Sequence, residues 1–154
     1  MDEIIIRAAV HKDLPAIVRL LAADEVAGSR ESLTDPIAES YVAAFEAISA
    51  DPNHGLFVAD KEGEIMGTFQ LSFIPNMTYQ GGWRAQIEGV MVSTNLRNQG
   101  IGTAMIRWAI ARARERDCLL VQLTSFNERT KAHQFYGKLG FVFSHQGAKL
   151  DLRE

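Results

Sequence analysis

The sequence contains a single cysteine, Cys118, among its 154 residues. One cysteine excludes an internal disulfide, and it also excludes the paired-cysteine motifs that hold metals or carry out redox chemistry. The sequence has no apolar run close to the roughly 18 residues that a membrane-spanning helix needs, and its acidic start is unlike a signal peptide. These absences predict a protein of a reducing compartment, most simply the cytoplasm, with no membrane partner.

The net charge of the chain is small and slightly acidic. The 16 Lys and Arg residues against 19 Asp and Glu residues leave a formal net charge of −3 and a pI near 5.8. This balance excludes a nucleic-acid partner that is held by bulk electrostatic attraction. No group of His, Cys and carboxylate residues has metal-ligand spacing, so no metal is expected. With 47% hydrophobic and 23% charged residues, the chain is predicted to form one globular domain over residues 1–154.

The most informative stretch runs from residue 87 to residue 108. Residues 87–92 alternate in the period-two manner of a strand, and a polar connection follows. The segment from Arg97 to Gly102 then carries two glycines and a basic residue, and it runs into a helical pattern with an apolar stripe. Glycines let backbone N–H groups approach a bound group, and a helix N-terminus adds unpaired donors with a partial positive charge. The stretch therefore predicts a phosphate-binding loop.

Two common phosphate motifs are absent from this loop. The spacing GxxxxGK[ST] of nucleotide-binding P-loops does not occur, and Met105 stands where the dinucleotide motif GxGxxG requires its third glycine. The remaining pattern is Arg97-x-x-Gly100-x-Gly102, which taken alone also fits a glycine-rich turn between a core strand and a core helix. In its context it resembles the R/Q-x-x-G-x-G/A loop of the GNAT N-acetyltransferase superfamily, which holds the pyrophosphate of acetyl-CoA.

A second motif near the end of the chain carries the same resemblance. The run N-x-R-x-x-A-H-x-F-Y extends from Asn127 to Tyr136. It is similar to the closing motif of many GNAT enzymes, in which an asparagine and a helix tyrosine face the CoA sulfur. Many members place the asparagine seven residues before the tyrosine, whereas here the separation is nine. The resemblance therefore supports the role of Tyr136 more directly than that of Asn127.

The order of the predicted elements is the order of the GNAT family. The resemblance implies an α/β (α+β) single-domain GNAT fold, with a mixed, mostly antiparallel central sheet flanked by about four helices. In that fold the parallel strands 4 and 5 splay apart. Periodicity and turn residues predict strands at 4–9, 55–59, 64–74, 83–92, 118–124 and from 141 onward, and helices at 14–24, 36–50, 101–114 and ending at 139.

The resemblance also implies which residues hold acetyl-CoA. In the family, backbone groups at the end of the fourth strand pair with pantetheine as another strand would. Gly89 suits a bulge that opens the strand for this purpose, although plain sheet core also explains the segment that follows it. The predicted acetyl-CoA contacts are Val90, Met91, Val92, Arg97, Asn98, Gln99, Gly100, Ile101, Gly102, Thr103 and Asn127.

The implied reaction is direct attack of a neutral primary amine on the acetyl thioester within a ternary complex. It needs a base for the ammonium ion, a donor for the oxyanion and an acid for the thiolate. A strand N–H after Gly89 would be the oxyanion donor. Tyr136 is the candidate acid, because a phenol with a pKa near ~10 is protonated at neutral pH. Glu88 is the candidate base, and alternation places it on the strand face of Val90 and Val92; water and His133 are the alternatives.

Each of these residues also has a plain structural interpretation. Tyr136 would then be a half-buried core tyrosine, Glu88 a solvated strand-edge carboxylate, and His133 a packing residue. Cys118 allows an acetyl-cysteine intermediate, but it has no catalytic pattern around it, and small buried cysteines are common. His54 is expected to lie at the surface.

The acceptor is predicted to be the amine of a small molecule. The run 87–92 is similar to glucosamine-phosphate acetyltransferases, and the run 127–136 is similar to aminoalkylphosphonate acetyltransferases. Arg84 or Arg129 would then meet an anionic group. Two alternatives stay open: acetylation of a protein N-terminus or lysine, and an acyl-CoA-binding sensor without turnover. The apolar segment 142–152 would allow a homodimer.

Overall fold

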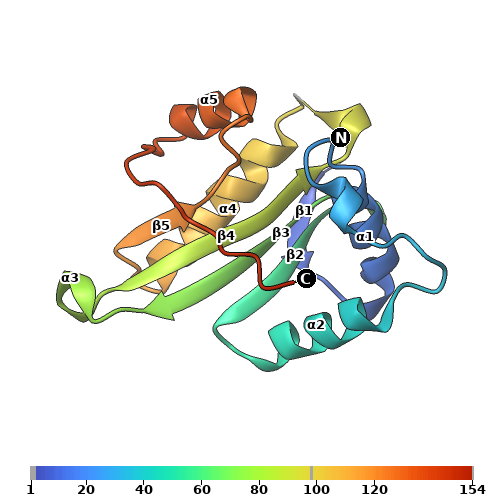
Figure 1. The fold of residues 1–154 in the computed structure, drawn as a ribbon, viewed down its shortest axis with the longest axis horizontal. Coiled ribbons are helices and arrows are strands. Elements are labelled where there is room, and N and C mark those ends of the chain that lie inside the picture. The colour runs from blue at the N-terminus through green and yellow to red at the C-terminus, as the bar shows by residue number, and fades with distance from the viewer. Residues whose placement is uncertain (1–2, 98, 154) are drawn as a thin grey trace. The chain divides into compact units, whose positions relative to one another are not determined.

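The computed structural model describes residues 3–97 and 99–153. The chain folds as two compact units, Met1–Gln122 and Leu123–Glu154, and each unit is described by itself. The strands, labelled as in Figure 1, are β1 (Ile5–Ala8), β2 (His54–Lys61), β3 (Glu64–Pro75), β4 (Trp83–Val92) and β5 (Leu120–Leu123). The helices are α1 (Leu14–Ala22), α2 (Glu39–Ala50), α3 (Thr78–Gly81), α4 (Ile101–Glu115) and α5 (Thr130–Lys138). Three short 3₁₀ turns are η1 (His11–Asp13), η2 (Gly28–Arg30) and η3 (Thr94–Leu96).

The strands form one sheet in the order β1-β2-β3-β4-β5. The pairs β1–β2, β2–β3 and β3–β4 are antiparallel, and β5 lies parallel to β4. Parallel neighbours need a crossover connection, and α4 provides it between β4 and β5. The predicted α/β fold, with a mixed and mostly antiparallel sheet whose fourth and fifth strands are parallel, is confirmed.

The turn between β2 and β3 is a tight two-residue hairpin. Glu62 and Gly63 have φ of 51° and 90°, the left-handed conformation at both central positions that matches the twist of the flanking strands. The Asp60 carboxylate accepts the N–H of Gly63 at 2.7 Å. This hydrogen bond is made within residues 60–63, so the turn is stabilised by its own residues.

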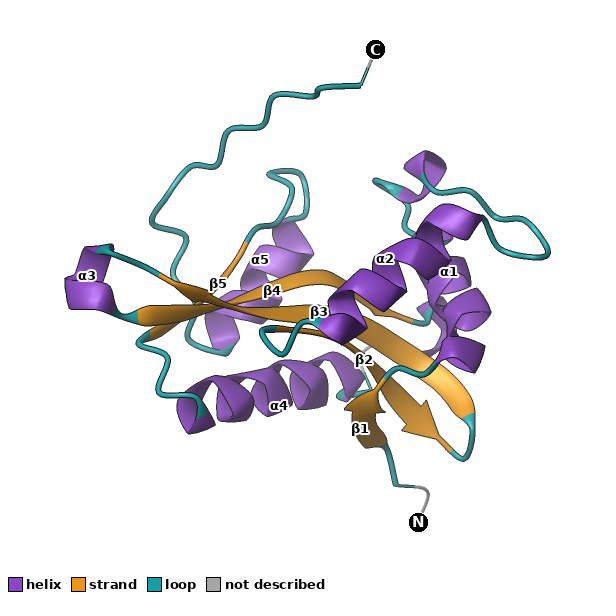
Figure 2. Cartoon of the chain, turned by 90° about the horizontal axis from the view of Figure 1, so that it is seen from below, coloured by secondary structure: helices purple, strands orange, loops and turns teal. Residues whose placement is uncertain are grey.

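Helices cover both faces of the sheet in the first unit (Figure 2). α4 lies on one face, where the ring of Trp108 contacts Phe57 and Phe69 with centroids 4.7 and 6.0 Å away. α1 and α2 lie on the other face, where Leu14 of α1 packs in one cluster with Val58 of β2. Because side chains alternate along a strand, odd-numbered residues in the middle of β2 and β3 face α4, and even-numbered residues face α1 and α2.

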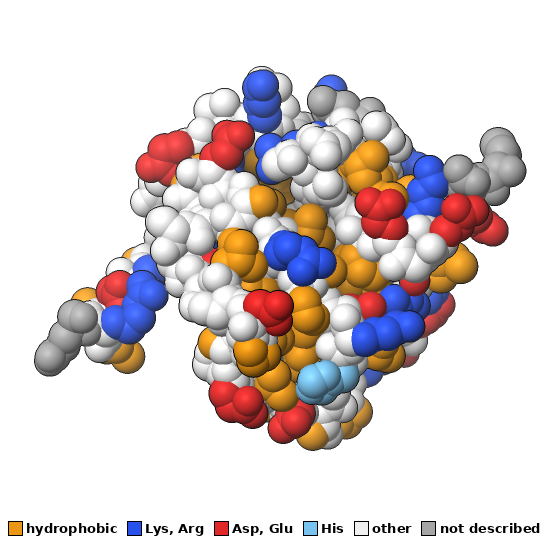
Figure 3. Space-filling model, turned by 90° about the vertical axis from the view of Figure 1, so that its right-hand side faces the viewer, with side chains coloured by type: hydrophobic (Ala, Val, Ile, Leu, Met, Phe, Trp, Pro, Cys, Tyr) orange, Lys and Arg blue, Asp and Glu red, His pale blue; other side chains and the backbone are white. Residues whose placement is uncertain are grey.

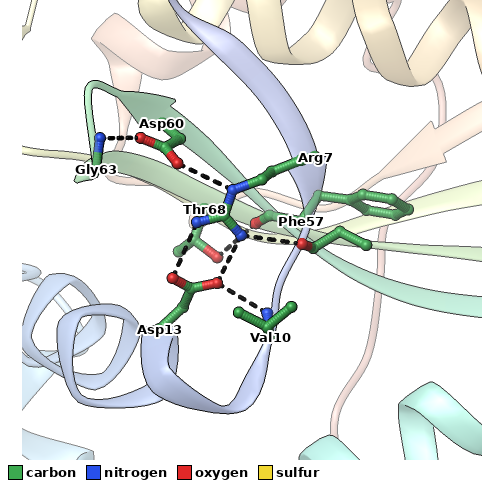
Figure 4. Close-up of polar contacts among 8 residues, drawn as sticks. Arg7, Val10, Asp13, Phe57, Asp60, Gly63 and Thr68 are labelled. Carbon is green, nitrogen blue, oxygen red and sulfur yellow. Dashed lines mark hydrogen bonds and ion pairs between the residues drawn. The ribbon is translucent and has the colours of Figure 1, made fainter.

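A polar network joins β1, the start of α1 and the β2–β3 turn (Figure 4). Arg7 donates to both carboxylate oxygens of Asp13 at 2.7 and 3.0 Å, and its Nε donates to Asp60 at 2.9 Å. Asp13 also accepts the backbone N–H of Val10 at 2.8 Å. Asp13 is only 4% exposed, so its negative charge is stabilised by these donors rather than by water.

Several elements differ from the sequence prediction: β2 extends to Lys61 rather than residue 59, and the short helix α3 was not predicted. α2 begins at Glu39 rather than near residue 36, and β5 covers only Leu120–Leu123 instead of 118–124. The described residues 141–153 contain no strand, so the predicted last strand from Phe141 is wrong. A strand exists only where a neighbour satisfies its backbone groups, and the side chains of residues 142–153 are exposed.

The side of the molecule that bears α1 and α2 faces the viewer in Figure 3. Acidic, basic and apolar side chains are interspersed on this side, as on most protein surfaces. Within residues 3–97 and 99–153, no helix is both long and apolar enough to cross a membrane. In the same ranges, no three His, Cys, Asp or Glu side chains gather closely enough to hold a metal ion.

Candidate active site

A bulge interrupts β4 next to the candidate base. Thr68 and Gln70 of β3 pair with Met91 and Glu88, so the two β4 residues between these partners oppose a single residue of β3. The first of the two is Gly89, which has a φ of +62°. Glycine adopts this left-handed conformation without steric cost, and it commonly occupies the first position of such a bulge. The bulge predicted at Gly89 is therefore confirmed.

The bulge changes which side chains share a face with Glu88. Simple alternation predicts that Val92 does. Directly opposed residues of antiparallel strands point to the same face, and Val92 pairs with Gly67, whereas Met91 pairs with Thr68. Met91 rather than Val92 therefore shares the face of Glu88, and the prediction is wrong. One extra residue in a strand moves every later side chain to the opposite face.

The candidate pantetheine-binding segment includes and follows the bulge. Val90 and Val92 are half-buried, and Met91 is buried at 6% exposure. A bulge leaves one residue without a partner in the ladder, so part of the backbone at residues 89–90 is not used for pairing with β3. This geometry suits an extended ligand that pairs with the strand.

The candidate phosphate loop leads directly into α4. Gly100 is the N-cap residue with φ of +82°, and a Cβ atom there would meet nothing within 4 Å. The open space suits an anion, because the first N–H groups of a helix have no acceptor inside it. Asn98 lies outside the described residues. The other candidates divide by exposure into exposed Arg97, Gln99 and Gly100, half-buried Gly102 and Thr103, and buried Ile101.

Tyr136 lies on α5 in the second unit and is 8% exposed. Its ring meets those of Phe135 and Phe141, with centroids 5.1 and 5.8 Å apart. Burial raises the pKa of the Tyr136 phenol above its ordinary value, against an opposing effect of the Arg129 cation. The phenol therefore keeps its proton at neutral pH, as a general acid must.

The other polar candidates of the second unit are His133 and Asn127. His133 Nε2 lies 3.0 Å from the carbonyl oxygen of Phe126, and its ring stacks on Phe143 at 4.4 Å. If Nε2 donates to that carbonyl, only Nδ1 is left to accept a proton, so these contacts favour a structural role for His133. Asn127 is exposed and lies three residues before the start of α5.

Glu88 and Cys118 differ in what they can do chemically. Glu88 is exposed, and it makes no hydrogen bond or ion pair with another described residue, so its carboxylate can accept a proton or bind an ammonium ion. Cys118 is half-buried, and this burial raises the pKa of its thiol. A raised pKa disfavours the thiolate, which is the nucleophilic form. The structure therefore argues against the acetyl-cysteine route.

A groove of about 620 Å³ lies between α1, the β2–β3 turn and the end of β4. Its lining residues fall in the ranges 12–23, 63–65 and 92–94. Lys12, Arg19 and Glu64 give the lining charges of both signs. Among the described candidates it includes Val92 but not Glu88, so it is distinct from the polar side chains around the candidate base.

The profile of the Acetyltransferase (GNAT) family matches residues 16–141 of this chain. The chain belongs to this family. The GNAT chain is 31% identical over 101 residues to the aminoalkylphosphonate N-acetyltransferase of Salmonella typhimurium, and 33% identical over 97 residues to the glucosamine 6-phosphate N-acetyltransferase of Trypanosoma brucei brucei. These matches cover 66% and 63% of this chain and 65% and 64% of the relatives. The chain thus spans just under two thirds of the length of these curated relatives.

Solved structures share the GNAT fold over nearly the whole chain. A crystal structure described as a transcriptional regulator from Bacillus halodurans C-125 is 45% identical with a TM-score of 0.95, covering 97% of this chain and 100% of its own. A structure described as an acetyltransferase with acetyl-CoA from Clostridium acetobutylicum is 22% identical with a TM-score of 0.75, covering 97% of each chain. At that identity the second likeness shows the fold alone.

The sequence did not identify one set of polar residues that lies beside Glu88 in this GNAT chain. Thr68, Gln70 and Ser72 alternate with apolar residues of β3, and through the register they share a face with Glu88. The period-two alternation is visible in the sequence and indicates a polar sheet face, but its alignment with β4 depends on strand pairing. His54 is exposed as predicted, yet its Nδ1 lies 2.8 Å from the hydroxyl of buried Ser72.

Proposed function

We propose that this protein transfers the acetyl group of acetyl-CoA to the primary amine of a small molecule, by direct attack in a ternary complex. The observation that carries the proposal is the glycine bulge at Gly89, followed in the same strand–loop–helix unit by left-handed Gly100 at the start of α4. The bulge suits an extended pantetheine, and the helix start suits a diphosphate. Membership of the GNAT family supports acetyl-CoA as the donor.

We assign the binding of acetyl-CoA to the residues predicted from the sequence. Acetyl-CoA supplies an electrophilic thioester carbon to the site. The backbone of residues 90–92 would hold the pantetheine, and N–H groups at the start of α4 would hold the phosphates. The proposed contacts are Val90, Met91, Val92, Arg97, Asn98, Gln99, Gly100, Ile101, Gly102, Thr103 and Asn127.

We assign Glu88 as the base and Tyr136 as the acid. Glu88 takes a proton from the acceptor ammonium ion, and the neutral amine nitrogen then bonds to the acyl carbon. A β4 backbone N–H near Val90 stabilises the oxyanion. As the carbon–sulfur bond breaks, Tyr136 donates its phenolic proton to the departing thiolate, and the second proton lost by the amine nitrogen restores the phenol through solvent. Overall the amine becomes an amide, the thiolate leaves as a thiol, and one proton passes to solvent.

A small-molecule acceptor is favoured over a protein acceptor. The names of the two curated relatives each denote a small molecule that carries an amine. Acetylation of a protein N-terminus or lysine is the alternative, and it needs an open groove for a peptide. The homodimer and the cytoplasmic location stay predictions from the sequence.

An acyl-CoA sensor without turnover is the second candidate function. The neighbour described as a transcriptional regulator favours it. The availability of Glu88 and the protonated state of buried Tyr136 favour an enzyme instead. Turnover by the wild-type protein distinguishes these two candidates, and replacement of the tyrosine hydroxyl then tests the acid role.

Tyr136→Phe is expected to lower kcat by about 10- to 100-fold, because a positioned general acid typically contributes 10²–10⁴-fold and solvent replaces part of it. The measurement is release of the CoA thiol at saturating acetyl-CoA. Phe135→Leu is the control, since it alters the aromatic neighbour but leaves the phenol in place. An unchanged kcat in Tyr136→Phe would remove the acid role.

Acetyl-CoA is expected to stabilise the purified protein against heat. A ligand at one hundred times its dissociation constant adds roughly 2.7 kcal/mol, which corresponds to a rise of several degrees in Tm for a domain of this size. ADP and NAD are the controls. A shift with acetyl-CoA alone supports the donor site, whereas no shift, or an equal shift with NAD, would contradict the assignment of the loop.

A further inference from the structure

A row of polar side chains crosses the sheet beside Glu88. In the β3–β4 register, Glu88 pairs with Gln70 and Gln86 pairs with Ser72, while Arg84 is two residues further along β4. Paired residues, and residues two apart on one strand, point to the same face. The three β4 residues and the two β3 residues therefore lie on one face, and we call them the polar row.

The polar row faces away from α4. On β3 the residues that flank its members point toward α4, since Phe69 contacts Trp108 and Phe73 lies under the guanidinium of Arg116 at 4.1 Å. The row therefore lies on the face where α1 and α2 pack. On this face the helices pack against the apolar residues Leu56 and Val58 of β2. The row provides polar side chains on the neighbouring strands β3 and β4 of the same face.

One polar atom of the row is buried without a partner, and the amide of the neighbouring Gln86 makes no hydrogen bond either. Gln86 is 9% exposed, and its side-chain amide makes no hydrogen bond to another described residue. The Nε of Arg84 is buried and has no hydrogen-bond partner among the described residues. Buried polar groups are usually hydrogen-bonded, and each exception needs an explanation. A bound polar ligand would supply the missing partners.

The guanidinium of Arg84 is held with one edge unused. Its Nη1 donates to the side-chain oxygen of Asn76, and Asn76 in turn donates to the carbonyl of Gly82 at 3.1 Å. The Nε–Nη2 edge makes no hydrogen bond to another described residue. Because Nε is buried, Nη2 is the atom that can donate a hydrogen bond to a carboxylate or a phosphate of a ligand.

The spacing along β4 matches a small molecule with two charged ends. Glu88 and Arg84 are four residues apart, which is about 13 Å along a strand at ~3.3 Å per residue. The guanidinium of Arg84 is held by Asn76 at the hairpin end, so a ligand that meets both charges spans about this distance. Gln86 lies midway, and its amide can donate and accept.

We propose that the acceptor is an amine that also carries an anionic group, a phosphate, phosphonate or carboxylate, and that it lies along β4. Its ammonium ion meets Glu88, its anionic group accepts a hydrogen bond from Nη2 of Arg84, and Gln86 binds polar atoms between them. This assignment rests on the proposed acetyl transfer. It makes Arg84 a specificity-determining residue, because Arg84 shares a strand face with Glu88.

The wild-type protein provides a test that needs no variant. Acetyl transfer is measured with glucosamine 6-phosphate against glucosamine, and with 2-aminoethylphosphonate against ethylamine. Each pair differs in its anionic group. The expected result is a kcat/KM roughly tenfold to hundredfold higher for the anionic member. Equal values within both pairs would overturn the assignment of Arg84 while leaving the acetyltransferase function in place.

Variants locate the effect at Arg84. Arg84→Gln is expected to raise KM for the anionic amines by roughly tenfold to hundredfold and to leave the neutral amines within about threefold. Arg107→Gln, an exposed arginine on α4 at the other face, should change neither. Equal losses for both kinds of amine would indicate that Arg84 only supports the hairpin end, and would overturn the proposal. Arg84→Lys keeps the charge and should recover part of the loss.

Calorimetric binding of 2-aminoethylphosphonate to the CoA-saturated protein distinguishes a failure of the proposed function from a failure of this inference. A dissociation constant at least tenfold weaker in Arg84→Gln, without any turnover in the wild type, would support the site and contradict the acetyl transfer. An unchanged dissociation constant, or no binding of either probe to the wild type, would overturn the site. Tm values of all variants establish that each one is folded.

Discussion

Glu88→Gln should lower kcat for acetyl transfer by about 100-fold or more at neutral pH, because a positioned general base typically contributes 10²–10⁴-fold. Glutamine keeps the size and polarity of the side chain but cannot accept the proton. Since Glu88 is exposed and unpaired among the described residues, the substitution should leave Tm unchanged. The measurement is kcat and KM for the acceptor, with acetyl-CoA saturating.

Glu88 can act as the base or bind the ammonium ion of the acceptor. The pH dependence, and whether kcat or KM changes, distinguish these two roles. A lost base lowers kcat, and activity returns as the pH approaches the pKa of the acceptor amine, because the neutral amine then forms without help. A lost ammonium contact raises KM instead. Glu46→Gln, an exposed glutamate on α2, is the matched control. If Glu88→Gln retains kcat within threefold of the wild type, His133 or water becomes the base.

Asp13→Asn should destabilise the protein by about 2 kcal/mol at pH 7, because it leaves part of the Arg7 charge without its partner in a partly buried pair. Arg7 keeps its hydrogen bond to Asp60 at 2.9 Å, so the loss stays below that of a fully orphaned charge. For a domain of this length, Tm should fall by about 5–10 °C. Thermal unfolding followed by circular dichroism measures the change.

The pH dependence of this destabilisation has a definite sign. The Arg7 guanidinium, with help from the N–H of Val10, holds the pKa of Asp13 below its ordinary value of 3.8. A carboxyl group with a lowered folded-state pKa contributes stability above its unfolded-state pKa, and loses it as the pH falls through the folded-state value. The difference between wild type and Asp13→Asn should therefore be constant from about pH 5 to 8 and shrink below about pH 4.

The control for Asp13 is an aspartate with the same kind of partner at the surface. Asp151 pairs with Arg153 at 2.7 Å, but both side chains are exposed. Exposed pairs contribute little to stability, so Asp151→Asn should leave Tm unchanged. A similar fall in Tm for both variants, or a difference at Asp13 that does not shrink as the pH falls below about 4, would contradict the role assigned to this network.

The strand, loop and helix of the proposed acetyl-CoA site could be predicted because the sequence patterns that specify them are local. Period-two alternation runs into β4, Gly89 and Gly100 adopt positive φ where glycine was expected to be needed, and the helical stripe begins at Ile101. Backbone conformation of this kind depends on a few neighbouring residues. The C-terminal strand prediction failed because a strand also requires a partner, which local alternation cannot supply.

Sequence by itself determined the GNAT family, the order of the five strands and the four longer helices, and the position of the bulge at Gly89; the short helix α3 was not predicted. Only the tertiary structure decided which side chains share a face. The bulge moves Met91 onto the face of Glu88, and the register aligns Gln70 and Arg84 with that same face. Periodicity states that side chains alternate, but the pairing of strands distant along the chain decides which of them meet, because that pairing is set by packing across the whole sheet.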